Sequence, residues 1–196
     1  MRNLFAKFSA VGGLEGWMIA KLSFKQLSKE RESVPKENSE AVILRQRARY
    51  AIFEAENADW QIQMHVIKPK EQKKEFASKV EQKKFSGEEL NVSKEIARWQ
   101  IAKKEILEFV ISVKDLNSIH RTEHAVVPGF LFVEKLWKEK KVAEHIKEWK
   151  EFEVIFSIPA YEEETITLLQ EEKTGNIFAV TRRETEPILL WECRKK

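Results

Sequence analysis

The chain has 196 residues, of which 42% are hydrophobic and 34% are charged, and its formal net charge is +3. Such a chain can bury a core without disulfides, which argues against wholesale disorder and predicts one globular domain. The single cysteine, Cys193, excludes an intramolecular disulfide and a cysteine-rich zinc site. Because no apolar run approaches the roughly 20 residues of a membrane span, and one cysteine is typical of a reducing compartment, we expect a cytoplasmic protein.

Residues 1–29 carry five basic side chains and one acidic side chain. Apolar residues recur at every third or fourth position from Leu4 to Leu27, which predicts a helix interrupted at Gly12 and Gly13. A basic amphipathic helix can lie on a membrane surface, but docking on the core is the simpler interpretation, and we favour it.

Residues 30–150 are expected to form a mostly helical body. Residues 41–56 have two interpretations, a helix or an alternating strand, and we favour the helix because alanine and glutamate are frequent. Residues 59–67 alternate strictly between apolar and polar side chains, which predicts a half-buried strand. Helical spacing and solvated lysine-rich sequence predict further helices at residues 71–85, 93–113 and 133–149.

Residues 151–196 contain four short β-favouring runs separated by turn residues, including Thr174 and Gly175. The predicted fold class is therefore α+β, with a mostly helical N-terminal two-thirds containing one isolated strand, packed on a C-terminal antiparallel meander of three or four strands. We expect one domain over residues 1–196, with residues 1–29 as a helical appendage, and we find no internal sequence repeat.

The most specific catalytic pattern is His120-Arg121-Thr122-Glu123-His124, which matches H-x-x-E-H. On a helix, His120 and His124 would share a face and could hold Zn²⁺, while Glu123 activated a bound water. A zinc-dependent hydrolase is accordingly one alternative function.

A second alternative is nucleic-acid binding by the basic body, which requires clustered cations. Glutamates lie between most of the basic residues of this body, which favours a solvent-exposed surface of mixed charge over a nucleic-acid-binding surface. The candidate residues are Arg45, Arg47, Arg49, Lys73 and Lys74.

A third feature is the apolar run at residues 125–133, which is either buried or part of a surface that binds another protein. The candidate partner-binding residues are Val126, Val127, Phe130, Leu131 and Phe132.

No other set of catalytic residue types occurs at a chemically meaningful spacing. By elimination, the sequence predicts a non-enzymatic, intracellular interaction or regulatory protein that binds another protein and needs no cofactor. The partner-binding interpretation is preferred over the nucleic-acid and zinc-hydrolase alternatives.

Overall fold

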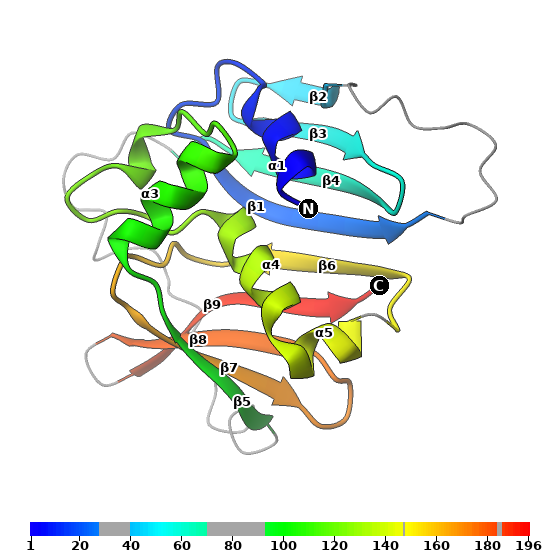
Figure 1. Ribbon diagram of the computed structural model, residues 1–196, viewed down its shortest axis with the longest axis vertical. Helices are drawn as coiled ribbons and strands as arrows, with labels where there is room; N and C mark the ends of the chain where they lie inside the picture. Colours follow the sequence, from blue (N-terminus) through cyan, green and yellow to red (C-terminus); the bar gives the residue numbers. More distant parts are fainter. Residues whose placement is uncertain (28–39, 70–92, 147, 184–185) are drawn as a thin grey trace.

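A computed structural model describes residues 1–27, 40–69, 93–146, 148–183 and 186–196. Within these residues, nine strands form one antiparallel sheet in the order β2-β3-β4-β1-β6-β9-β8-β7-β5. The helices lie together over one face of this sheet (Figure 1).

The sheet contains the same strand arrangement twice. In the first unit, β1 (Met18–Gln26) is followed by a meander of β2 (Val42–Arg47), β3 (Tyr50–Glu56) and β4 (Trp60–Ile67), and β4 pairs back with β1. In the second unit, β6 (Glu151–Phe156) is followed by β7 (Thr165–Glu171), β8 (Ile177–Arg183) and β9 (Glu186–Lys195), and β9 pairs back with β6. One additional strand, β5 (Ser93–Gln100), pairs with the outer edge of β7. The chain therefore has a topological repeat that its sequence does not display.

Pairing between β1 and β6 joins the two units. On the helix side, Phe24 lies opposite Phe152, and their rings stack with centroids 4.5 Å apart. On the other side, Lys25 pairs with Glu151 across the same junction at 3.4 Å. Because side chains alternate between the faces of a strand, one junction carries an apolar side and a charged side.

Four helices and one 3₁₀ turn cover the apolar side. They are α1 (Arg2–Ser9), α3 (Lys103–Ser112), the 3₁₀ turn η1 (Ser118–His120), α4 (Gly129–Lys138) and α5 (Lys140–Ile146). The ring of Phe5 in α1 stacks on Phe130 in α4 with centroids 4.3 Å apart, and Arg2 pairs with Glu134 at 2.6 Å. The N-terminal helix is thus packed on the core. No helix in the described residues is long and apolar enough to cross a membrane.

The predicted, mostly helical N-terminal two-thirds is wrong, because five of the nine strands lie there. In β1, Leu22 and Phe24 face the core while Lys21 and Lys25 face outward, an alternation that the helical spacing of Trp17, Met18 and Leu22 obscures. Residues 41–56 form β2 and β3, the alternative that we ranked second. In residues 93–113 the helix begins only at Lys103, since residues 93–100 pair with the distant β7. The hydrophobic periodicity within a short stretch of sequence contains no information about pairing with a distant strand.

Four strands do occupy residues 151–195, but they do not form a separate meander. They are one half of the continuous sheet, and β6 pairs with β1 and β9 rather than with β7. The helix expected at residues 71–85 lies outside the described residues.

Candidate functional site

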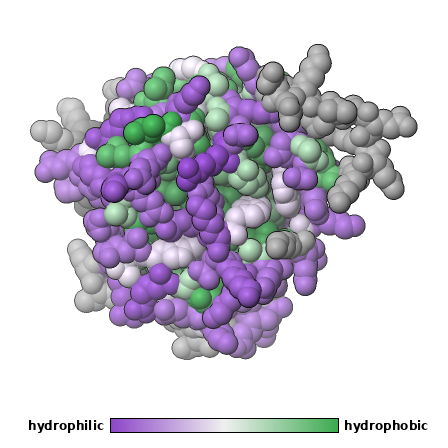
Figure 2. Space-filling view, in the orientation of Figure 1, coloured by the Kyte–Doolittle hydropathy of each residue, from purple (hydrophilic) through white to green (hydrophobic). Residues whose placement is uncertain are grey.

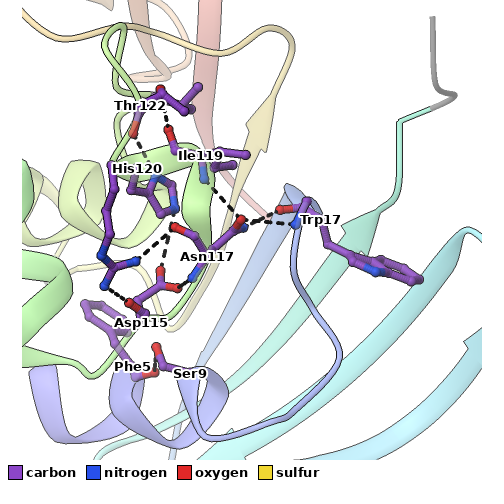
Figure 3. Close-up of polar contacts among 11 residues, drawn as sticks. Phe5, Ser9, Trp17, Asp115, Asn117, Ile119, His120 and Thr122 are labelled. Carbon is purple, nitrogen blue, oxygen red and sulfur yellow. Dashed lines mark hydrogen bonds and ion pairs between the residues drawn. The ribbon is translucent and has the colours of Figure 1, made fainter.

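The candidate site is the segment of residues 114–121, which follows α3, contains η1 and is called the site loop below. Helix α3 ends where Lys114 takes a left-handed conformation, with φ of 56°. The amide of Asp115 donates back to the carbonyl of Val110 at 2.8 Å, which closes the helix end. This turn places Asp115 just beyond the helix, with its side chain toward η1 (Figure 3).

His120 ends η1, and only 7% of its surface is exposed. Its Nδ1 lies 2.7 Å from the carbonyl oxygen of Val126. A carbonyl can only accept a hydrogen bond, so Nδ1 carries a proton and donates. Burial lowers the pKa of His120, and the nearby Asp115 carboxylate partly opposes that effect. The folded protein therefore favours a neutral imidazole whose Nε2 has a free lone pair.

Asp115 and His120 converge. The Oδ1 atom of Asp115 accepts from the amide of Asn117 at 2.9 Å, and its Oδ2 lies 3.6 Å from Nε2 of His120. Both facing atoms are hydrogen-bond acceptors when the imidazole is neutral. A gap of 3.6 Å between two acceptors suits a third group, such as a water or a hydroxyl, that donates to either of them.

Asn117 ties this loop to the first unit. Its Nδ2 donates to the carbonyl of Trp17 at 2.9 Å, and its Oδ1 accepts from the amide of Gly16 at 3.1 Å. The Trp17 ring points away from the site, so the link is made by the backbone before β1 (Figure 3). The loop that carries Asp115 and His120 is thereby held by residues about 100 positions earlier in the chain.

Two further features surround the pair. Arg121 donates to the backbone carbonyls of Asp115 and Asn117, which braces the loop on its solvent side. Ile111 and Leu116 are 71% and 82% exposed, and a hydrophobic area lies over the end of α3 at the upper left of Figure 2. A buried histidine that faces a half-buried aspartate, beside exposed apolar side chains, can act on a polar group attached to an apolar chain.

The start of α4 lies close to the junction of the two units. A Cβ at Gly129 would lie 3.2 Å from Ile19 of β1 and 3.1 Å from Phe156 of β6. The first amides of a helix have no acceptor within it, so a helix start favours nearby negative charge. Only two residues separate this helix start from Val126, the partner of His120.

The structure does not assemble the predicted zinc triad. His120 is buried, whereas Glu123 and His124 lie exposed in the turn that follows η1. The segment is not helical beyond His120, so the expected shared face does not form. Among the described residues, no group of three or more His, Cys, Asp or Glu side chains could hold a metal ion.

The predicted partner-binding run is largely internal. Val126 is half-buried, and the other candidates are buried in the core: Val127, Phe130, Leu131 and Phe132. The run is buried because its residues form the start of α4 and the segment that precedes α4, both of which pack into the core.

Of the predicted basic residues, Arg45 and Arg47 lie on β2, and Arg49 lies in the turn to β3, where it donates to the carbonyl of Lys68. All three are exposed. Lys73 and Lys74 lie outside the described residues.

Sequence reasoning singled out His120 but missed Asp115 and Asn117. It interpreted residues 117–121 as a simple break between helices. A signal was available, because Asp115 is one of only two aspartates in the chain and stands five residues before a histidine at that break. Spacing alone could not show that the two side chains point toward each other.

No family model and no curated protein matches the chain. Solved structures do resemble it. HtdX from Mycobacterium tuberculosis aligns with a TM-score of 0.59 and 14% identity, covering 100% of this chain and 87% of that one. A MaoC-like dehydratase from Phytophthora capsici gives 0.51 and 11%, covering 95% and 71%. The peroxisomal multifunctional enzyme type 2 from Drosophila melanogaster gives 0.53 and 11%, covering 91% of this chain and 37% of that one.

At these identities the likeness establishes the fold, a hot-dog-like fold in which a long antiparallel sheet wraps around helices. Enzymes, including a dehydratase, share this fold. The finding contradicts the predicted non-enzymatic interaction or regulatory protein, and the nucleic-acid and zinc-hydrolase alternatives receive no support from it. The chain has a hot-dog-like architecture, and the segment that links its two units carries a half-buried aspartate facing a buried histidine.

Proposed function

We propose that the protein is an enzyme that reversibly removes water from a substrate with a hydroxyl group β to a carbonyl. The observation that carries this proposal is the approach of His120 Nε2 to Asp115 Oδ2 at 3.6 Å, with both atoms available as acceptors. The dehydratase among the structural neighbours gives the reaction class.

In dehydration, His120 Nε2 takes the proton from the carbon next to the carbonyl. The bond from the β-carbon to its hydroxyl oxygen then breaks, and the hydroxyl leaves as water after receiving a proton from the Asp115–His120 pair. The pair ends with the protons it held at the start, and hydration is the reverse. The positive end of α4 is suited to the negative charge that develops on the carbonyl oxygen.

The apolar side chains of Ile111 and Leu116 favour a substrate with an acyl chain, and we take 3-hydroxyacyl thioesters as the substrate class. A thioester carbonyl makes the neighbouring C–H more acidic. A neutral imidazole is a weak base and can remove that proton only because the carbonyl acidifies it. The predictions of a cytoplasmic location and of no required cofactor stay untested.

The test is hydration of 2-enoyl thioesters of short and long chain length, followed by the loss of ultraviolet absorbance of the conjugated double bond. We expect D115N and H120Q each to lower kcat by about 10²–10⁴-fold, with the double variant no worse than the more affected single variant. The matched controls are D59N and H124Q, since Asp59 and His124 are exposed and contact neither residue of the pair through their side chains.

The pH dependence supplies a second readout. Because burial lowers the pKa of His120, its neutral, basic form persists at pH values below the usual pKa of 6.5. We therefore expect kcat/KM to fall only when the pH drops below 6.5. Wild-type protein inactive toward every thioester tested, or an H120Q variant with full activity, would refute the proposed function.

A further inference from the structure

Strand β2 (Val42–Arg47) forms one outer edge of the sheet. Its counterpart in the second unit is β7, whose outer edge pairs with β5 along residues 93–100. In the part of the chain that the structure describes, no strand occupies the corresponding place beyond β2. The outward backbone donors and acceptors of β2 therefore form a template on which one more strand can pair.

The side chains of β2 are exposed along its whole length. Val42, Ile43 and Leu44 are 59%, 50% and 49% exposed. At the opposite edge of the sheet, the apolar residues of β5, Ile96, Ala97 and Trp99, are half-buried and pack against the core. Only the β2 edge of the described sheet thus leaves three consecutive large apolar side chains half in solvent.

Charge distinguishes the two faces of this edge. Arg45 lies opposite Ile52 and Arg47 opposite Tyr50, so both arginines lie on the sheet face away from the helices, whereas Ala51 and Phe53 are buried toward them. Within the described residues, neither Arg45 nor Arg47 has a carboxylate within ion-pair distance, although Arg98 at the other edge pairs with Glu95 at 2.9 Å. Two unpaired cations at alternate positions match a strand with acidic residues at alternate positions.

We propose that the β2 edge binds an extended acidic segment of a partner protein, which adds to the sheet as an additional strand. Backbone hydrogen bonds would supply affinity, and pairing of glutamate or aspartate with Arg45 and Arg47 would set the register. A second copy of this chain fits less well, because antiparallel pairing of two β2 strands would gather four of these arginines on one face. This inference is independent of the proposed dehydratase activity.

The test uses the full chain and an eight-residue peptide that alternates valine with glutamate. We expect micromolar binding that weakens with salt, together with slower amide hydrogen exchange in residues 42–47. The R45E/R47E variant should weaken binding at least tenfold. The matched control is R182E, because Arg182 is also exposed but lies on the interior strand β8, and its binding should stay within twofold.

Two control peptides separate strand addition from simple charge attraction. A peptide of the same sequence with N-methylated backbone nitrogens keeps its charge but cannot donate to β2, and we expect no binding. Equal binding by that peptide, no binding by the parent peptide, or binding unaffected by R45E/R47E would each overturn the proposal. So would a dimer in sedimentation experiments that dissociates when Leu44 is replaced by aspartate, since the occupant would then be a second copy.

Discussion

Asn117 joins the site loop to residues 16 and 17, which precede β1, so the N117A variant tests whether that link holds the site loop. The substitution removes the bond from Nδ2 to the Trp17 carbonyl at 2.9 Å and the bond from the Gly16 amide to Oδ1 at 3.1 Å. It also removes the weak cap of η1, in which the amide of Ile119 lies 3.5 Å from Oδ1.

The two hydrogen bonds to residues 16 and 17 contribute about 1 kcal/mol each, and the cap about 0.5 kcal/mol. We therefore expect N117A to lower the free energy of unfolding by about 2–3 kcal/mol. For a chain of this size the melting temperature should fall by about 4–12 °C. Urea denaturation followed by circular dichroism measures the change, and an unchanged m-value would show that the compactness of the end states is unaffected.

The same variant should lower kcat of the proposed reaction by about tenfold with little change in KM, because it loosens the geometry of Asp115 and His120 without touching substrate. The matched control is N3A, since Asn3 is exposed on α1 and should change stability by less than about 0.5 kcal/mol. If N117A were as stable as N3A, the argument that residues 16 and 17 hold the site loop through this side chain would be wrong.

Three further predictions concern other positions. The hydrogen-bonded ion pair with Arg2 lowers the pKa of Glu134 from 4.5 to about 2, so the stability that this pair contributes is complete above pH 4.5 and is lost as the pH falls toward 2. Because Arg2 is half-exposed and partly screened by solvent, E134Q should lower the free energy of unfolding by about 1–2 kcal/mol at pH 7. It should also flatten the acid limb of a stability–pH profile. G175A should lower the free energy of unfolding by about 1–3 kcal/mol, because φ of Gly175 is +73° and the new Cβ would lie within 3 Å of the His145 ring. Calorimetry should show a smaller cost of G175A in a protein that also carries H145A. L116N should leave the melting temperature unchanged but raise KM for long-chain thioesters more than for short ones, and an equal effect on both would contradict an acyl-chain contact.

Local pattern predicted some of the secondary structure. The strict alternation of residues 59–67 corresponds to β4, and the turn residues Thr174 and Gly175 lie between β7 and β8. These features depend on interactions within one hairpin or on one buried face, which a short window contains. The strands β1 and β5 were missed because their partners lie far away in the chain, and β5 pairs with residues about 70 positions away. Strand β2 pairs with the neighbouring β3, but it is exposed along its whole length and has no buried face to impose a period.

The candidate site shows the same division. The sequence identified His120 as chemically notable, but the assumed helix gave it Glu123 and His124 as partners. The actual partners are Asp115, five residues earlier in the loop that follows α3, and the carbonyl of Val126. The segment forms a short 3₁₀ turn that ends at His120 instead of a helix through His124, so His120 and His124 do not share a face.

By itself, the sequence determined that the chain has enough apolar material for a core, that Cys193 has no disulfide partner within the chain, and that local strand and turn signals lie at residues 59–67 and 151–196. Only the tertiary structure decided that two units share one sheet, that α1 packs against α4, and that Asn117 connects the site loop to residues 16 and 17. The physical reason is that these features rest on contacts between residues some 100 or more positions apart. Their free energy depends on the whole packed arrangement, which a pattern of neighbouring residues does not contain.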